Sequence, residues 1–224
     1  MINWAGKFGD DYTERNSTIV DRQPFFQKLG RYPIEYALEI GCNIGLNMMA
    51  IEAATDIQTQ GCDINEKALS IAREGNLKVE TASGLDLPYG DKEFDLVFTV
   101  GVLIHMSTQD MITMMYEMER VSSKFILMGE YEGNDTEIEY RGHRGALVKR
   151  QYGRIWKSLF PWSQHMWKDM VLDGFDTVTF WMYDIRDSSS EDAVYTFSGE
   201  GIDTDRRKAD DNASIAEIAK ERLS

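Results

Sequence analysis

The sequence has few cysteines, no long apolar run and no dense block of basic residues. Its two cysteines, Cys42 and Cys62, lie beside predicted strand ends and lack the spacing of metal ligands, so the sequence predicts neither a disulfide framework nor a metal site. No apolar run is long enough to cross a bilayer, and the first residues show no basic segment followed by an apolar one. We therefore expect no membrane span and no signal peptide, and a cytoplasmic location.

The chain is acidic: its 224 residues carry a formal net charge of −14. A polyanion would be repelled unless a local basic patch compensated, and residues 141–154 contain only scattered Lys and Arg. Nucleic acid is therefore an unlikely partner. The length and an apolar fraction of 42% are typical of one sizeable domain. The sequence leaves the oligomeric state open.

Between residues 34 and 130, apolar and β-branched stretches alternate with segments of helical character. The expected strands are 34–40, 57–63, 77–82, 94–100 and 125–130, and the expected helices are 45–54, 65–74 and 108–120. Such alternation predicts an α/β fold, in which a doubly wound parallel sheet is built from right-handed crossovers.

The two ends of the chain depart from this alternation. After residue 130 we expect a polar loop at 132–145, a helix at 147–160 and closing strands at 170–172 and 177–185, so that the domain spans 34–187. Residues 1–33 form a separate segment with a short helix at 21–29. Its aromatic and polar stretch 4–16 either covers a sheet edge or forms a lid over a ligand. The acidic residues 188–224 are expected to be a partly disordered extension.

Glycines and an acid mark the carboxyl ends of the predicted strands. A Glu39-x-Gly41-x-x-x-Gly45 turn follows the first strand, and Asp63 ends the second. Glycine lets the backbone approach a ligand, and an acid at the second strand end suits two ribose hydroxyls. Ser83 and residues 101–105 follow the third and fourth strands at the same edge. The sequence therefore predicts a nucleoside site, and the missing Gly-x-Gly-x-x-Gly pattern favours a ligand without a pyrophosphate, such as S-adenosyl-L-methionine.

Residues 34–185 resemble the class I S-adenosylmethionine-dependent methyltransferases. The Glu39–Gly45 turn is similar to the first motif of that fold, Asp63 to its ribose-binding acid, and Phe94-Asp95-Leu96-Val97 to its fourth-strand motif. Residues 4–16, 38–46, 101–105 and 140–143 are similar, more specifically, to methylases associated with pseudaminic acid biosynthesis. The resemblance implies a Rossmann-like, mostly parallel seven-stranded sheet and a methyltransferase that uses S-adenosyl-L-methionine.

The resemblance also implies which residues contact the cofactor. The backbone of the first turn would approach the methionine part, Asp63 would bind the ribose and Ile64 would pack on the adenine. Arg15, from the segment before the sheet, could meet a carboxylate. The full expected set is Arg15, Glu39, Gly41, Cys42, Asn43, Gly45, Asp63, Ile64, Ser83, Gly101 and Val102.

Methyl transfer needs an aligned acceptor, and a hydroxyl or amine acceptor also needs a base. The candidate catalytic residues are His105, His143 and Glu130. The candidate acceptor-binding residues are Tyr131, Tyr140, Arg141 and Arg144; the two arginines either bind the carboxylate of an acidic sugar or belong to a solvated loop. We expect a small-molecule acceptor, such as a nucleotide-linked or acidic sugar. A protein or nucleic acid acceptor, a non-catalytic cofactor-binding module and a dehydrogenase stay open as alternatives.

Overall fold

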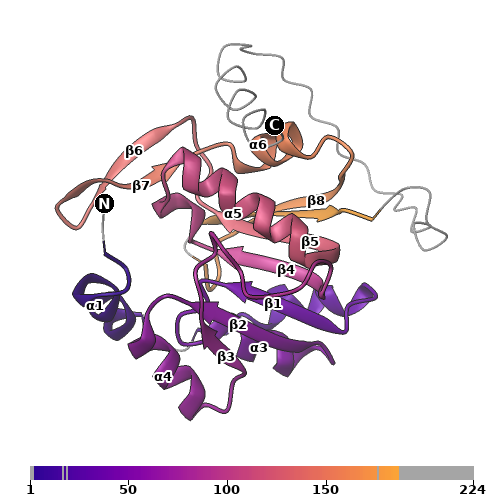
Figure 1. Ribbon diagram of the computed structural model, residues 1–224, viewed down its shortest axis with the longest axis horizontal. Coiled ribbons are helices and arrows are strands. Elements are labelled where there is room, and N and C mark those ends of the chain that lie inside the picture. Colours follow the sequence, from indigo (N-terminus) through magenta and orange to yellow (C-terminus); the bar gives the residue numbers. More distant parts are fainter. Residues whose placement is uncertain (1–2, 17, 19, 176, 187–224) are drawn as a thin grey trace.

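A central sheet with helices on both faces organises the chain (Figure 1). The computed structural model describes residues 3–16, 18, 20–175 and 177–186. The extension expected at 188–224 lies outside the described residues. In the described part of the chain, no helix combines the length and the apolar character that crossing a bilayer requires.

The sheet has seven strands in the order β3-β2-β1-β4-β5-β9-β8. Neighbours among the first five strands pair in parallel, and β9 pairs antiparallel with both β5 and β8. The strands are β1 (Tyr36–Ile40), β2 (Gln58–Asp63), β3 (Val79–Thr81), β4 (Phe94–Val100), β5 (Ser122–Glu130), β8 (Gln164–Val171) and β9 (Val178–Asp184). The predicted α/β, mostly parallel seven-stranded sheet is confirmed. The strand order reverses between β1 and β4, which is where ligands bind in doubly wound sheets.

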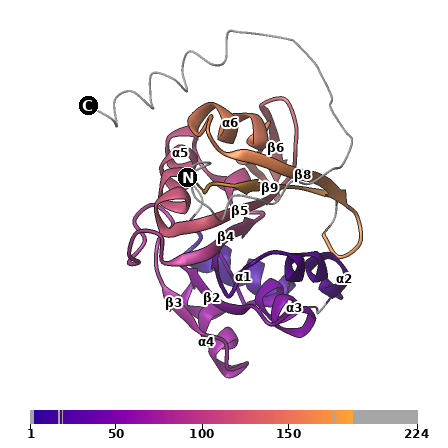
Figure 2. The same ribbon diagram turned by 90° about the vertical axis from the view of Figure 1, so that its right-hand side faces the viewer.

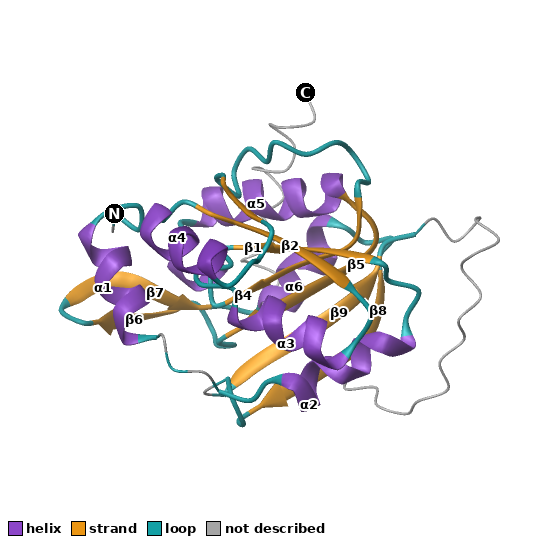
Figure 3. Ribbon diagram, turned by 90° about the horizontal axis from the view of Figure 1, so that it is seen from below, coloured by secondary structure: helices purple, strands orange, loops and turns teal. Residues whose placement is uncertain are grey.

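Alternate residues of the central strands face two separate cores. Leu38, Val97 and Ile126 pack with the buried methionines of α5 and the aromatic side chains of α6. Ala37 and Leu96 face the other core, which α2, η1 and α3 cover. Because neighbouring residues of a strand point to opposite faces, both faces of these strands must be apolar. Figure 3 shows α5 on one side of the sheet and α2 and α3 on the other, and Figure 2 shows the latter two side by side.

The helices at 46–54, 66–74 and 108–121 begin and end within one residue of their predicted bounds, whereas the sequence did not predict the helix at 7–15. Asn65 caps the helix that follows β2, its side chain accepting the N–H of Ala68 at 2.8 Å, as an N-cap residue does. The helical segments are α1 (Lys7–Arg15), α2 (Gln23–Phe26), η1 (Gln27–Arg31), α3 (Leu46–Ala54), α4 (Glu66–Glu74), η2 (Leu103–His105), α5 (Thr108–Val121) and α6 (Tyr152–Leu159).

The segment after β5 differs from the sequence-based prediction. In place of a loop at 132–145 and a helix starting at 147, β6 (Thr136–Tyr140) and β7 (His143–Lys149) form an antiparallel hairpin. Tyr140 pairs with His143, so the connection is the two residues Arg141 and Gly142, with φ values of 52° and 80°. A two-residue turn with positive φ at both positions matches the twist of a hairpin. The prediction of a loop failed because it treated Gly142 as a sign of irregular structure, whereas this glycine is part of a tight hairpin turn.

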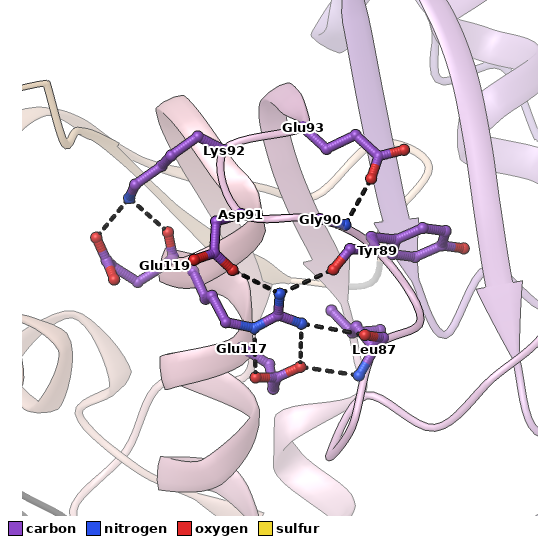
Figure 4. Close-up of polar contacts among 9 residues, drawn as sticks. Leu87, Tyr89, Gly90, Asp91, Lys92, Glu93, Glu117 and Glu119 are labelled. Atoms are coloured by element: carbon purple, nitrogen blue, oxygen red, sulfur yellow. Dashed lines mark hydrogen bonds and ion pairs between the residues drawn. The ribbon is translucent and has the colours of Figure 1, made fainter.

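The loop between β3 and β4 is fastened to α5 (Figure 4). The guanidinium of Arg120 donates to the carbonyl oxygens of Leu87 and Tyr89 at 3.0 and 2.8 Å, and to the carboxylates of Asp91 and Glu117. A planar group with five donors can hold several acceptors of an irregular loop at once. This network holds residues 87–91, the later part of the loop that also carries Ser83, against α5.

Candidate functional site

The turn between β1 and α3 passes too close to neighbouring side chains for any residue but glycine at two positions. Gly41 and Gly45 have φ values of 74° and 81°. A Cβ atom on Gly41 would lie 2.4 Å from Cγ2 of Val102, and one on Gly45 would lie 2.1 Å from Cδ1 of Leu77. The two glycines therefore meet both a conformational and a steric requirement. Gly41 brings the turn against Val102, which follows β4, and Gly45 brings it against Leu77, which precedes β3.

Asp63, at the end of β2, joins the first turn to the start of α4. Its Oδ2 accepts the backbone N–H of Asn43 at 2.8 Å, and its Oδ1 accepts that of Asn65 at 2.8 Å. Burial raises the pKa of Asp63, and these backbone bonds act in the opposite direction. Each carboxylate oxygen keeps lone-pair capacity, so the group can still accept hydroxyl hydrogens. The next side chain, Ile64, is 41% exposed and presents an apolar surface beside it.

Glu39 is a buried acid with one unsatisfied oxygen. Its Oε1 accepts the Nδ2 hydrogen of Asn47 at 2.6 Å, whereas Oε2 has no hydrogen-bond partner in the described structure. Burial raises the pKa of Glu39 to about 8, against the opposing effects of Asn47 and of the charge on Arg22. An unpaired buried carboxylate oxygen is costly. The position therefore suits a cationic ligand group, and the ammonium of S-adenosylmethionine fits this requirement.

Arg22 approaches the same acid through Asn47. Its Nη1 donates to Oδ1 of Asn47 at 2.6 Å and its Nε donates to the carbonyl of Gly174 at 3.0 Å, while its guanidinium lies 4.8 Å from the centre of the Phe175 ring. Sequence reasoning missed Arg22, because a lone arginine before the first strand forms part of no motif. Only the packing of α2 and α3 brings it to the strand ends.

Glu130, at the end of β5, supports the short helix that follows β4. Its Oε1 accepts the N–H groups of Val102 and Leu103 at 3.1 and 3.0 Å, and its Oε2 accepts that of Ile104 at 3.3 Å. Burial raises the pKa of Glu130 to about 8, although these bonds lower it. The carboxylate thus satisfies the free N–H groups at the start of η2, which orients the turn that carries His105.

His105 lies in an aromatic environment between β7 and the N-terminal segment. Its Nδ1 is 2.6 Å from the carbonyl oxygen of Ala146, and its ring centre is 4.5 Å from that of Trp4 and 5.9 Å from that of Tyr140. Burial lowers the pKa of His105, while the bond to Ala146 raises it. The ring is therefore neutral at neutral pH, and Nε2 is the nitrogen that can accept a proton.

The N-terminal helix α1 is tied directly onto the strand ends. The Nδ2 group of Asn65 donates to the carbonyl of Trp4 and to Oδ1 of Asp10, both at 3.0 Å, and Nδ2 of Asn43 donates to Oγ1 of Thr13 at 3.2 Å. Figure 3 shows α1 beside the β6–β7 hairpin. The stretch 4–16 is therefore held at the strand ends, and its role as a lid stays a prediction.

One side chain of α1 that sequence reasoning did not single out also faces this region. Burial raises the pKa of Tyr12, and Tyr140 and Asp63 raise it further, whereas Arg22 lowers it. These groups come from the hairpin, from β2 and from the segment before the sheet. The signal that could have found Tyr12 is its place within the aromatic stretch 4–16.

The remaining predicted residues are spread more widely. Cys42 is buried, and a Cβ on Gly101 would meet no atom within 4 Å in the described structure, so open space lies beside the end of β4. Ser83 accepts the N–H of Leu85 at 3.2 Å, and Tyr131 contacts both cores. Arg15, Arg141 and His143 are exposed. The ring centre of His143 lies 5.3 Å from that of Phe8, and the guanidinium carbon of Arg141 lies 5.7 Å from the ring centre of Tyr140. Arg144 lies on β7, and its side chain is outside what the structure describes. The roles of all these residues stay predictions.

Known proteins that are similar to this chain are methyltransferases. Residues 37–124 match the family described as "Methyltransferase domain". Among curated proteins, the chain is 32% identical over 90 residues to "Probable tRNA methyltransferase 9B" of Mus musculus, covering 40% of this chain and 20% of that protein. It is 31% identical over 94 residues to ajmaline N-methyltransferase of Rauvolfia serpentina, covering 38% of this chain and 32% of that protein.

The fold is shared with solved methyltransferase structures. Magnesium protoporphyrin IX methyltransferase from Synechocystis PCC 6803 with bound SAH superposes with a TM-score of 0.63 at 14% identity, covering 82% of this chain and 97% of that one. By contrast, the chain spans only 20% and 32% of the two curated relatives above. The matched family segment includes the glycine turn and Asp63, and it ends before the hairpin and α6.

Proposed function

We propose that this chain, whose core is a class I S-adenosylmethionine-dependent methyltransferase domain, transfers the methyl group of that cofactor to a hydroxyl or amine of a small acidic molecule. The observation that supports binding of the methyl donor, the donor half of this proposal, is the buried, unpaired Oε2 of Glu39 beside the glycine turn. It suits the cofactor's ammonium, and Asp63 suits the ribose hydroxyls at the next strand end.

Other residues around the turn complete the proposed cofactor site. Ile64 offers an exposed apolar side chain for the adenine. Arg22, held by Asn47 beside Glu39, is suited to the cofactor's carboxylate, because a guanidinium recognises a carboxylate through paired hydrogen bonds. This assigns to Arg22 the role that the sequence suggested for Arg15. The open space beside Gly101 is where the methyl-bearing part would lie.

The bound cofactor supplies a methyl group on a sulfonium, which makes the methyl carbon electrophilic and gives a neutral thioether as the leaving group. The protein's part is to align the acceptor and to remove its proton. We assign the proton to Nε2 of His105, because its Nδ1 is bonded to Ala146 and its lowered pKa keeps the ring unprotonated. Glu130 acts as a positioning residue, since its oxygens hold the turn that carries His105.

A small acidic acceptor is favoured over a nucleic acid. The resemblance to methylases associated with pseudaminic acid biosynthesis suggests an acidic or nucleotide-linked sugar, and ajmaline N-methyltransferase is a relative named for a small molecule. The similarity to a protein named as a probable tRNA methyltransferase makes tRNA the competing acceptor, but the net charge of −14 opposes it.

Isothermal titration with S-adenosylmethionine and S-adenosylhomocysteine tests the donor half. We expect binding to the wild-type chain, weaker binding to the Glu39→Gln variant and no binding of NAD. The absence of binding at high micromolar cofactor, or equal binding by both proteins, would contradict the proposed site. Transfer of a radiolabelled methyl group to a panel of acidic and nucleotide-linked sugars, with bulk tRNA in parallel, tests the acceptor half. Labelling of tRNA alone would reverse the ranking.

A further inference from the structure

Arg150 is a buried cation with an unsatisfied donor, and the cofactor site does not use it. Its side chain is 8% exposed, and Nη1 has no hydrogen-bond partner in the part of the chain that the structure describes. Among the described residues, an ion pair joins its Nε to Oδ1 of the exposed Asp135 at the long distance of 3.9 Å. A buried guanidinium hydrogen without an acceptor is costly, so this position is suited to an acceptor group that comes from outside the protein.

The protein groups around Arg150 leave this donor unpaired. Glu130 is close enough for the charge of Arg150 to lower its pKa, but the oxygens of Glu130 already accept three backbone N–H groups. Tyr152 is a second neighbour: its hydroxyl accepts a hydrogen bond from the side chain of Arg150 and donates to the carbonyl of Val148. This bond does not involve Nη1, which has no hydrogen-bond partner among the described residues. Nη1 is therefore the nitrogen of Arg150 that the described residues leave without an acceptor.

The position of Arg150 links it to the acceptor side of the site. It directly follows β7, four residues after Ala146, whose carbonyl oxygen is bonded to His105. Its neighbour Glu130 holds the N–H groups of the same short helix that carries His105. The end of β5, η2 and β7 therefore pack together, and they carry both the proposed base and the guanidinium whose Nη1 lacks a partner among the described residues.

We propose that Arg150 binds an anionic group, a carboxylate or a phosphate, of the acceptor molecule. This inference rests on the proposed function and narrows it, because it requires an acceptor with an oxyanion. A guanidinium offers two parallel N–H groups to such an oxyanion, and the interaction is strongest where water is excluded. Arg141, which the sequence suggested for this role, lies exposed at the tip of the hairpin. Arg150 lies buried at its base.

The test uses the full chain saturated with S-adenosylhomocysteine and three probes that share one ring: D-glucuronate, D-glucose 1-phosphate and D-glucose. Binding is measured by saturation-transfer difference NMR and by the shift in Tm. We expect binding of at least one anionic probe and none of glucose. Which of the two anionic probes binds more tightly identifies the oxyanion. In the Arg150→Met variant we expect roughly 10- to 100-fold weaker binding of that probe, the loss of a hydrogen bond between charged groups.

Two further variants keep the test decisive. Arg154→Met removes an exposed arginine four residues later and should leave probe binding unchanged. If Arg150→Met does not fold, Arg150→Lys keeps the charge but loses the paired donors, and it should bind the anionic probe several-fold more weakly than the wild type. Equal binding of glucose, binding of no probe, or full binding by a folded Arg150 variant would overturn the proposal and leave Nη1 to a water molecule. If S-adenosylhomocysteine itself does not bind, the proposed function fails first.

Discussion

The Nδ1 atom of His105 lies 2.6 Å from the carbonyl oxygen of Ala146. A carbonyl oxygen can only accept, so Nδ1 must carry the hydrogen and donate it, which leaves the lone pair of the neutral ring on Nε2. Burial also favours the neutral ring, because it lowers the pKa of His105. The fold thus selects both the protonation state and the tautomer that a general base requires.

We predict that His105 titrates below its usual pKa of about 6.5. Since the pKa is lower in the folded than in the unfolded chain, the stabilisation that the neutral ring provides is present above pH ~6.5 and is lost as the pH falls below it. ¹⁵N NMR of the imidazole should show Nδ1 protonated at neutral pH. His105→Asn keeps a donor for Ala146 but cannot titrate. Its Tm should therefore fall less than that of the wild type on acidification, and parallel Tm profiles would contradict the prediction.

Arg22 should contribute to cofactor affinity through the amino-acid part alone. We expect Arg22→Met to weaken the binding of S-adenosylhomocysteine by roughly 10- to 100-fold, as expected for a lost charged hydrogen bond. Binding of methylthioadenosine, which lacks the amino and carboxyl groups, should be unchanged. Arg31→Met, which removes an exposed arginine from the same segment before β1, is the control for the lost charge. Isothermal titration measures both ligands. Equal losses for the two would indicate a general structural role for Arg22.

Gly41 and Gly142 form a matched pair for testing the first turn. Their φ values are 74° and 80°, but a Cβ on Gly41 would lie 2.4 Å from Val102, whereas a Cβ on Gly142 would meet no described atom within 4 Å. We expect Gly142→Ala to cost about 1–2 kcal/mol from backbone strain and Gly41→Ala to cost about 3 kcal/mol or more, because overpacking adds to the strain. Urea unfolding measures both costs, and equal values would show that the clash relaxes freely.

Asn65 allows the anchoring of α1 to be separated from helix capping. Asn65→Ser keeps a hydroxyl that can cap α4 but is too short to reach Trp4 and Asp10, whereas Asn65→Ala loses both functions. We expect faster amide hydrogen exchange in α1 for both variants. The free energy of unfolding should fall by about 1 kcal/mol more for the alanine than for the serine variant, the typical worth of a cap. Unchanged exchange in α1 would show that other contacts hold this helix.

The sequence by itself determined the sheet and the position of the glycine turn and of Asp63 at its edge. The Phe94–Val100 strand has the predicted bounds, and Asn65 caps the predicted helix, because apolar runs and capping residues act over a few neighbouring residues. The glycine turn and Asp63 could also be predicted, since strand ends in a parallel sheet must meet at one edge.

Some side chains near that edge belong to neither the glycine turn nor the second strand end. Only the tertiary structure decided which these are. Arg22 reaches Glu39 through Asn47, and Arg150 lies near Glu130, across gaps in sequence that no local pattern spans. The sequence identified the glycine turn but not the arginines. A turn depends on the conformational limits of a few adjacent residues, whereas a buried charge pair depends on how whole helices and hairpins pack.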